Sequence, residues 1–410
     1  MNFYDTQETR DPALREQELF GRLPGLIHFA QRNTTAYART LSGIDPAAIT
    51  DRAALARIPV TRKSELLEKQ KLDRPFGGFA PDWRGAAGRV YASPGPIYEP
   101  EGRAADYWRT ARALYAAGFR SGDLVHNAFS YHMTPGAWIM EAGAQALGCS
   151  VFPAGVGQTE QQVQAMADLQ PDGYVGTPSF LRILVDKAEE SGVALPRLKK
   201  ALVSGEAFPP SVRDSLAAKG IQAYQAYATA DLGAIAYESP AREGLIVDEG
   251  VIVEIVRPGT GEPVADGEVG ELVVTVFNHD YPLIRFGTGD LSAVLPGASP
   301  CGRTNMRIKG WMGRADQTTK VKGMFVHPSQ VADVVRRHAP VQRARLVVEN
   351  PDHQDRMTLH CEVAEGEPAL AEAIAGSIRE VTKLRGEVVF CPPGSLANDG
   401  KVIDDLRRYE

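Results

Sequence analysis

The feature that most constrains this fold is a regular alternation of short apolar runs and helical segments in the first half of the chain. Helical segments of roughly a dozen residues separate the apolar runs, which lie at 123–129, 149–153, 174–175, 201–203 and 223–227. Strands joined through helices in this way pair in parallel, because the chain must cross a face of the sheet to return. The sequence therefore predicts an α/β fold with mainly parallel sheets flanked by helices.

The chain changes in character twice after this region. From about residue 240 to residue 312, short strands joined by Gly/Pro turns predict a β-rich subdomain, either antiparallel or barrel-like. After Gly313, strands alternate with two amphipathic segments, which predicts a small α+β domain. We therefore expect a large N-terminal domain over 1–313 and a small C-terminal domain over 314–410.

Composition excludes several classes of protein. The chain has 410 residues, 43% of them hydrophobic, as in ordinary globular proteins. The net charge of −6 argues against a general nucleic-acid binder. No apolar run approaches the roughly 18 residues of a membrane span, and the four cysteines form no CxxC pair. We expect a cytoplasmic protein without nucleic-acid or membrane partners, and we leave a homodimer open.

The stretch Tyr281–Asp290 is the first candidate for a binding site. An apolar run leads into Gly287-Thr288-Gly289, and the next residue is a carboxylate. Glycines let the backbone turn and approach a ligand closely, and an aspartate can accept hydrogen bonds from both hydroxyls of a ribose. The alternative is an ordinary strand followed by a turn, with Asp290 solvated.

Three further segments follow in order. Gly313–Asp316 lies at the expected domain boundary, Gly323–Val331 comes next, and Asp399–Val402 is close to the end of the chain. An arginine and an aspartate at a hinge can contact a nucleotide in one domain orientation and solvent in another. The alternative for Gly313–Asp316 is an exposed linker with an ion pair.

In this order, the four segments resemble the motifs of the adenylate-forming superfamily, and most closely its phenylacetate–CoA ligase branch. The resemblance covers the chain from about Arg89 to its end. It implies ATP-dependent activation of a carboxylic acid, aromatic and phenylacetate-like, to an acyl-adenylate. Rotation of a mobile C-terminal domain then permits transfer of the acyl group to coenzyme A.

The resemblance also implies roles for single residues. Lys401 is the catalytic cation of the first step, placed across the carboxylate and α-phosphate oxygens. Asp290 binds the ribose, Arg314 assists at the ribose or the phosphates, and Asp316 is the pivot of the hinge. Without the family order, Lys401 is an exposed lysine near the end of the chain.

Two more segments match the family by position. Ser204–Phe208 matches the adenine-binding turn, whose contacts here are Glu206, Ala207 and Phe208; the alternative is a plain strand-to-helix loop. Residues 227–231 match the YGLSE-like motif, which implies nucleotide contacts from Tyr227 and Ala228. Its acidic position, Asp231, is implied to hold Mg²⁺, with aspartate in place of glutamate.

The acid pocket is implied to lie between residues 131–138 and 176–180, with an aromatic and histidine-containing lining that suits a flat aromatic acid. Its candidate residues are Tyr131, His132, Gly136, Gly176 and Pro178. The alternative is that Trp138 and Met140 belong to the core and that His132 is a loop residue.

The main departure from the family is at the phosphate loop. A loop rich in Ser, Thr and Gly with a lysine is expected there, but residues 92–102 keep only Ser93 and Gly95 and add two glutamates, Glu99 and Glu101. Prolines remove N–H donors, and carboxylates repel a triphosphate. Two alternatives therefore stay open: transfer to a carrier protein, and a non-catalytic protein that binds a nucleotide or acyl-CoA.

Overall fold

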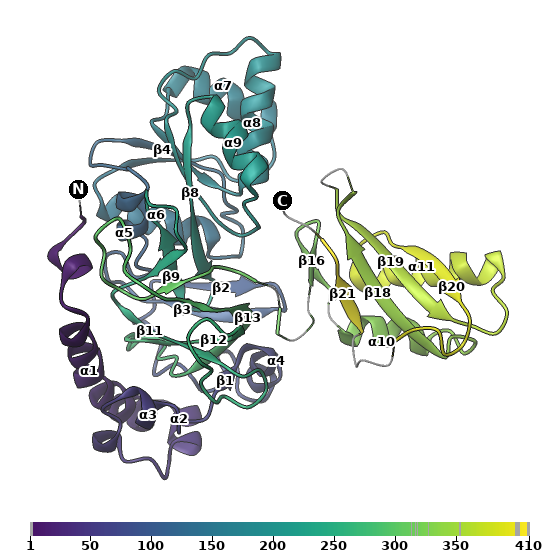
Figure 1. The fold of residues 1–410 in the computed structure, drawn as a ribbon, viewed down its shortest axis with the longest axis horizontal. Helices are drawn as coiled ribbons and strands as arrows, with labels where there is room; N and C mark the ends of the chain where they lie inside the picture. The colour runs from purple at the N-terminus through teal and green to yellow at the C-terminus, as the bar shows by residue number, and fades with distance from the viewer. Residues whose placement is uncertain are drawn as a thin grey trace. The chain divides into compact units, whose positions relative to one another are not determined.

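A computed structural model describes residues 3–312, 314–315, 317, 319–326, 328–351, 354–397 and 402–407, without the side chains of 325, 328 and 329. The chain forms two compact units, Met1–Gly313 and Arg314–Glu410 (Figure 1). The helices of the first unit are η1 (Thr6–Thr9), α1 (Pro12–Asn33), α2 (Thr35–Thr40), η2 (Pro46–Ala48), α3 (Arg52–Leu55), α4 (Lys63–Leu72), α5 (Ala111–Ala116), α6 (Gly136–Ala146), α7 (Thr159–Leu169), α8 (Pro178–Glu190) and α9 (Pro210–Ala218).

A nine-stranded sheet organises the first unit, in the order β14-β15-β10-β9-β8-β7-β6-β4-β5. Its five parallel strands are β4 (Leu124–Asn127), β5 (Ser150–Pro153), β6 (Gly173–Gly176), β7 (Lys200–Val203) and β8 (Gln222–Thr229). The other four pair antiparallel and are β9 (Gly233–Glu238), β10 (Leu245–Val247), β14 (Val294–Leu295) and β15 (Arg307–Ile308). The predicted α/β class and parallel region are confirmed.

Both faces of the parallel strands are covered by helices, which explains their continuous apolar character. Alternate strand residues such as Val175 and Leu202 pack against α5 and α6. Their neighbours Tyr174 and Ala201 pack on the opposite face, against α7, α8 and α9. Figure 1 shows these two helix layers on either side of β4 and β8.

The predicted β-rich subdomain is divided between two sheets and is not a barrel. Part of it, β10, β14 and β15, extends the nine-stranded sheet. The rest forms a four-stranded sheet in the order β1-β13-β12-β11, made of β1 (Thr61–Arg62), β11 (Val251–Val256), β12 (Gly270–Val276) and β13 (Phe286–Ser292). Since β1 pairs with β13 across more than two hundred residues, local patterns gave no sign of it.

In the Tyr281–Asp290 stretch, the order of strand and irregular segment is opposite to a strand followed by a turn. Its apolar part is buried but irregular, whereas Gly-Thr-Gly and Asp290 lie within β13. The change occurs at Arg285, which has a φ of +46° and a fully buried guanidinium. That guanidinium donates to both oxygens of Glu254 (2.9 and 3.0 Å) and to the carbonyl of Gly261 (2.7 Å). These bonds compensate its burial and fix the entry into β13.

A small hairpin precedes α5, formed by β2 (Arg89–Ser93) and β3 (Ile97–Glu101). The helix that follows the hairpin begins only at Ala111, the first residue of α5. Asp106 and Arg109 both have positive φ, 49° and 61°, so the chain turns there. The Asp106 carboxylate then accepts hydrogen bonds from the N–H groups of Thr110 and Ala111, which fixes the start of the helix.

The second unit has its own core. A sheet in the order β20-β19-β18-β21 packs against two helices, with Leu346, Leu359 and Ile378 among the buried residues. Its elements are β16 (Thr319–Val321), β17 (Met324–Val326), α10 (Pro328–Arg336), β18 (Arg343–Glu349), β19 (Arg356–Glu362), α11 (Pro368–Thr382), β20 (Glu387–Cys391) and β21 (Ile403–Asp405). The α+β character is as predicted.

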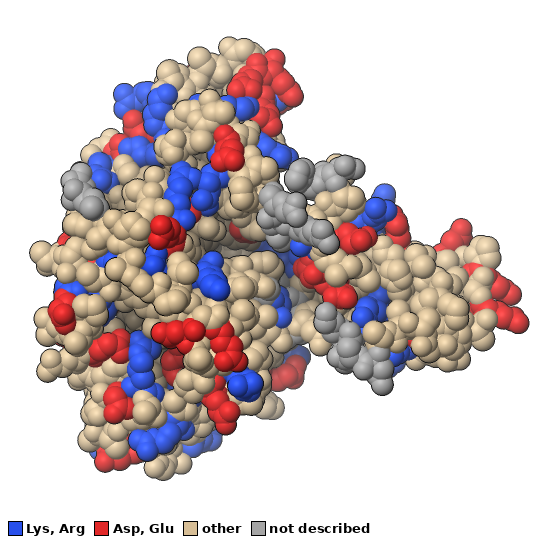
Figure 2. All heavy atoms as spheres, viewed as in Figure 1, with Lys and Arg blue, Asp and Glu red and all other residues tan. Residues whose placement is uncertain are grey.

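The surface carries both signs of charge. Figure 2 shows Lys and Arg interspersed with Asp and Glu over the face drawn. Within the described ranges, no helix is both long enough and apolar enough to cross a membrane.

Candidate functional site

The predicted site segments of the first unit follow neighbouring parallel strands. The residue after β4 is bonded to β6, with Ala128 N–H donating to the Val175 carbonyl (2.8 Å). The residue after β7 is bonded to the end of β6, with Ser204 N–H donating to the Gly176 carbonyl (3.1 Å). Carboxyl ends of parallel strands meet at one edge of a sheet, the usual place for ligands in open α/β folds. The structure thus gathers the acid-pocket and adenine segments at one edge.

Asp290 lies on β13 of the four-stranded sheet, where this sheet contacts β8 of the nine-stranded sheet. Its side chain is mostly buried, with the residue 9% exposed. Oδ2 accepts a hydrogen bond from the hydroxyl of Tyr227 on β8 (2.7 Å), and Oδ1 accepts one from the indole Nε1 of Trp311 (3.2 Å). Two of the predicted nucleotide residues, Tyr227 and Asp290, are therefore in direct contact. The carboxylate is held in one orientation by donors from two different segments.

Asp231, the predicted metal ligand, is a buried carboxylate just after β8. Its side chain is 0% exposed, and the ammonium of Lys63 lies 2.5 Å from Oδ2. Oδ1 is buried and has no hydrogen-bond partner among the described residues. Within the same residues, no group of three or more His, Cys, Asp or Glu side chains could hold a metal ion. Any metal here therefore needs oxygens from elsewhere.

The predicted adenine turn joins β7 to α9 and contains residues of different exposure. Glu206 is exposed, and its Oε1 accepts a hydrogen bond from the N–H of Ser179 at the start of α8 (2.7 Å). Ala207 is half-buried, whereas Phe208 is buried in the core with the Arg213 guanidinium 4.9 Å from its ring centre. Ala228 is half-buried at a β-bulge beside Tyr227. The turn is thus anchored from both sides.

The first acid-pocket segment, after β4, is held by hydrogen bonds. The Tyr131 hydroxyl donates to Glu141 (2.6 Å) and accepts from the Asn127 amide (2.9 Å), and its ring packs edge-on against Trp138. Burial raises the pKa of Tyr131, and the adjacent Glu141 raises it further, so the phenol stays neutral. His132 is exposed. The Tyr131 side chain is therefore held in one orientation by its neighbours.

The other predicted pocket residues are small or rigid. Gly136 opens α6 close to the ring of Phe129, and Pro178 is buried at the first position of α8. At Gly176, an added Cβ would lie 2.1 Å from the hydroxyl of Tyr174, so only glycine fits the end of β6. The space beside Gly176 is thus filled by the Tyr174 side chain, and Gly136 has the Phe129 ring as its neighbour.

The β2–β3 hairpin takes the position of the divergent phosphate loop. Its turn, which includes Gly95, is exposed, but Ser93 and Glu99 are buried. The Ser93 hydroxyl donates to Glu99 Oε1 (2.6 Å) and the Ser93 N–H donates to Oε2 (3.3 Å). Burial and then the negative charge of Asp231 raise the pKa of Glu99 to about 8. The donors of Ser93 are therefore already used within the hairpin.

Glu101 has a structural role that its position in the sequence did not indicate. It is 3% exposed and accepts hydrogen bonds from the Tyr91 hydroxyl (2.6 Å), the Trp108 indole (3.0 Å) and Arg89 (2.9 Å). Three hydrogen-bond donors compensate the cost of burying this carboxylate. Its charge is thus neutralised within the fold and is not directed at a ligand, contrary to what the sequence suggested.

The remaining predicted residues belong to the hinge and to the second unit. Arg314 is the first residue of that unit and is half-buried. Asp316 and Lys401 lie outside the described residues.

Comparison with known proteins gives consistent matches. The model of the family described as AMP-binding enzyme matches residues 106–276. The chain is 31% identical to the phenylacetate–coenzyme A ligase of Thermus thermophilus, over 97% of this chain and 96% of that one. It is 30% identical to the phenylacetate–coenzyme A ligase of Escherichia coli, over 94% and 93%. The chain belongs to the phenylacetate–coenzyme A ligase family.

A solved structure supports the same assignment for this phenylacetate–coenzyme A ligase family member. A 2-hydroxyisobutyryl-CoA ligase in complex with 2-HIB-AMP and CoA aligns with a TM-score of 0.83 and 26% identity, over 98% of this chain and 92% of that one. The resemblance read from the ordered motifs is therefore confirmed.

Two residues of the site in this phenylacetate–coenzyme A ligase family member were missed by sequence reasoning. Lys63 is the first residue of α4 and directly follows β1, which pairs in parallel with β13, and its ammonium lies beside Asp231. Trp311, which donates to Asp290, follows no recognised motif. In the sequence, the only indication that Lys63 could belong to the site was its positive charge directly after Thr61-Arg62.

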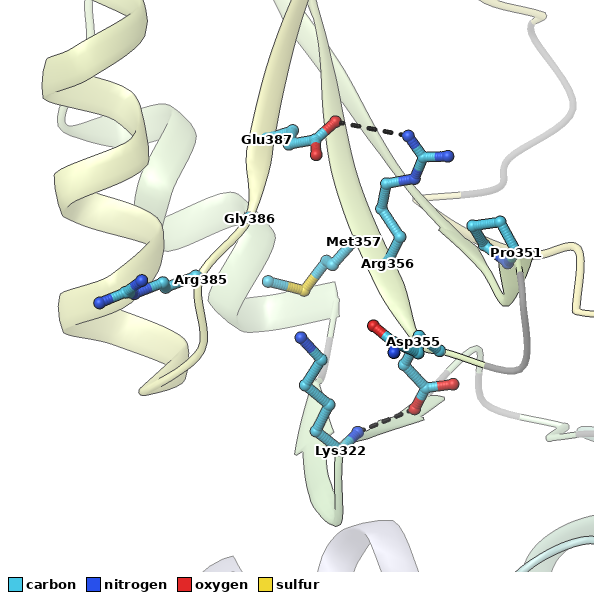
Figure 3. Close-up of a pocket in the computed structure, with 9 residues that line it drawn as sticks. Lys322, Pro351, Asp355, Arg356, Met357, Arg385, Gly386 and Glu387 are labelled. Carbon is cyan, nitrogen blue, oxygen red and sulfur yellow. Dashed lines mark hydrogen bonds and ion pairs between the residues drawn. The ribbon is translucent and has the colours of Figure 1, made fainter.

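The second unit of this family member contains a cavity of about 410 Å³. Figure 3 shows Lys322 beside Asp355 and Arg356 beside Glu387, around the side chain of Met357. None of the predicted site residues lines this cavity among those described. We assign no part of the site to it.

Proposed function

We propose that this protein uses ATP to activate a carboxylic acid as an acyl-adenylate and then transfers the acyl group to coenzyme A. Relatives that align over nearly the whole chain are phenylacetate–coenzyme A ligases, and the solved neighbour carries an AMP adduct and CoA. The observation that carries the proposal is the Asp290 carboxylate, held by Tyr227 and Trp311 at the same sheet edge as the adenine turn.

The nucleoside would be bound by residues of the first unit. Asp290 accepts hydrogen bonds from the two ribose hydroxyls, because one carboxylate oxygen can accept more than one hydrogen bond. The adenine lies against Glu206, Ala207 and Ala228. Phe208 supports the turn from the core side.

The first chemical step needs charge neutralisation more than covalent help. Lys401 would neutralise the charge that develops between the acid carboxylate and the α-phosphate, and Arg314 would assist at the ribose or phosphates. Asp316 would be the pivot about which the C-terminal domain moves before the thioester step.

Asp231 fits a Mg²⁺ ligand. Mg²⁺ is bound by one or two carboxylates, with waters and substrate phosphates completing its shell. The buried Oδ1 of Asp231, without a hydrogen-bond partner among the described residues, is an available oxygen of this type. When bound, Mg²⁺ supplies positive charge to the pyrophosphate leaving group.

The acid would lie between the segment after β4 and the start of α8. Gly136 begins α6 at this sheet edge, Gly176 ends β6 there, and Tyr131 offers a rigid aromatic wall. A flat aromatic acid of phenylacetate type suits this lining.

Exchange of labelled pyrophosphate into ATP tests the proposal, measured across aryl and fatty acids. We expect exchange with at least one aryl acid and thioester formation when CoA is added. Transfer to a carrier protein alone would appear as exchange without CoA thioester. The buried Glu99 favours one alternative, a non-catalytic nucleotide-binding protein. AMP binding without exchange for every acid would support that alternative and refute the ligase.

A further inference from the structure

Asp290 lies at an irregularity of β13, where the strand alone does not orient its side chain. The pairing of β13 with β12 shifts in register just before Leu291, so residues 288–290 have only Leu272 opposite them. Bulges of this kind are common beside active sites, because they redirect a side chain. The N–H of Asp290 donates to Thr288 Oγ1 (3.1 Å), which fixes the backbone. The direction of the carboxylate is left to side-chain contacts.

Trp311 supplies one of these contacts from a segment that is bonded to β13 on both sides of it. The carbonyl of Gly310 accepts a hydrogen bond from Ser292 Oγ (2.7 Å). The N–H of Met312 donates to the carbonyl of Leu291 (2.9 Å). The backbone of Trp311 is thus held from its two neighbours, and its indole N–H approaches the carboxylate from a fixed direction.

Packing in the core does not explain the position of Trp311. The residue is 42% exposed, and the hydrophobic clusters formed by the described residues do not include it. A side chain with this exposure can have water as its hydrogen-bond partner. Its indole Nε1 instead lies 3.2 Å from Oδ1 of Asp290. The contact with the carboxylate is therefore the feature that sets Trp311 apart.

Trp311 and Tyr227 bind the two different oxygens of this carboxylate. The indole N–H donates to Oδ1 (3.2 Å), and the Tyr227 hydroxyl donates to Oδ2 (2.7 Å). The torsion that turns an aspartate carboxylate is broad and roughly two-fold, so it does not by itself hold the group in one plane. Donors on both oxygens do hold it. A ligand can then meet both oxygens at the same time.

We propose that Trp311 is a positioning residue that makes Asp290 select nucleotides with both ribose hydroxyls. The proposal rests on the proposed function, because it takes Asp290 as the ribose ligand. Two hydroxyls need both carboxylate oxygens in place at once, whereas a single hydroxyl can be met by either oxygen of a carboxylate that turns. A site built to bond a hydroxyl rejects the analogue that lacks it, because its polar groups are then left unpaired.

Calorimetric titration of the full chain with AMP, 2′-deoxy-AMP and 3′-deoxy-AMP tests this role. The wild type should bind AMP about 10-fold or more tighter than either deoxynucleotide, the scale of one hydrogen bond to a charged group. Trp311→Phe keeps an aromatic ring but removes the donor, so its preference for AMP should fall to about 3-fold or less. A loss of structure alone would weaken the binding of all three ligands equally and leave the preference unchanged.

Trp311→His separates the donor from the bulk of the side chain. Nε2 of histidine has the same place in its ring as the indole Nε1, and it carries a proton in one neutral tautomer and in the charged form. Trp311→His should therefore keep more of the preference for AMP than Trp311→Phe, although histidine is smaller. Trp83→Phe is the matched control, at a half-buried tryptophan that packs edge-on against Phe76, and should bind all three ligands as the wild type does.

Four results would overturn the proposal. They are no preference for AMP in the wild type, an unchanged preference in Trp311→Phe, a greater loss of preference in Trp311→His than in Trp311→Phe, and loss of all nucleotide binding in both variants. If only Trp311→Phe binds no nucleotide, a preference kept by Trp311→His supports the proposal and a preference lost there overturns it.

Failure of this proposal and failure of the proposed function can be told apart, because nucleotide binding needs no turnover. A preference lost in Trp311→Phe, with no pyrophosphate exchange for any acid, leaves the role of Trp311 standing without the ligase. Exchange together with an unchanged preference in Trp311→Phe leaves the ligase standing without this role for Trp311.

Discussion

A single carboxylate, Asp290, carries the proposed nucleoside site, and its removal should be measurable directly. Asp290→Ala should weaken AMP binding by about 1–3 kcal/mol, the scale of hydrogen bonds to a charged group. Tyr227→Phe removes only the hydroxyl that donates to Oδ2, so its loss should be smaller. Isothermal titration calorimetry with AMP measures both. Unchanged affinity in Asp290→Ala would contradict the ribose assignment.

At the scale of residues, the sequence indicated the candidate site carboxylates but not the residues that contact them. Asp290 and Asp231 were found from local motifs, but the donor Trp311 and the counter-ion Lys63 come from other segments. Such contacts depend on tertiary pairing, which a local pattern does not contain. Glu101 shows the converse, since its charge looked available in the sequence but is satisfied by three donors.

At the scale of elements, the spacing of apolar residues predicted strands and helices correctly where each face of the element is uniformly buried or exposed. The parallel strands lie close to their predicted positions, and α6 to α9 lie in the helical segments predicted between them, because apolar runs and helical spacing reflect two covered sheet faces. The stretch 281–290 was misread because its hydrophobicity comes from burial in an irregular segment before β13. A buried arginine at positive φ, Arg285, causes this change, and no periodicity encodes it.

Substitution by alanine should change the free energy of unfolding in opposite directions at two helical glycines, because the added methyl group meets other atoms at one position and none at the other. In α6, a Cβ at Gly143 would lie 2.2 Å from Thr110 Oγ1, so Gly143→Ala should lower the free energy of unfolding by about 1–3 kcal/mol through overpacking. In α11, Gly376 has nothing within 4 Å, so Gly376→Ala should raise it by about 0.5–1 kcal/mol.

Urea denaturation of both variants measures these changes. Each variant is the control for the other, since both substitutions add one methyl group and both raise helix propensity. Destabilisation by Gly376→Ala would show that α11 is packed more tightly there than its surroundings indicate. No loss in Gly143→Ala would show that α5 and α6 can separate without cost.

At the scale of the whole molecule, the chain is two units with separate cores. Clusters around the nine-stranded and four-stranded sheets belong to the first unit, and a separate cluster that includes Val321, Leu346 and Ile403 forms the core of the second. The proposed nucleoside, metal and acid contacts come from the first unit. Arg314 and Lys401, proposed for the phosphates and the first chemical step, come from the second. Domain movement between the two steps is therefore part of the proposed function.

This division predicts that one substitution separates the two half-reactions. Lys401→Ala should reduce exchange of labelled pyrophosphate into ATP by about 100-fold or more, as the loss of a single charge-stabilising group does elsewhere. Thioester formation from preformed acyl-adenylate and CoA should continue at a similar rate, because the α-phosphate bond is already made. Lys71→Ala, at an exposed lysine of α4, controls for loss of one positive charge. Equal losses in both half-reactions would refute a role for Lys401 confined to the first step.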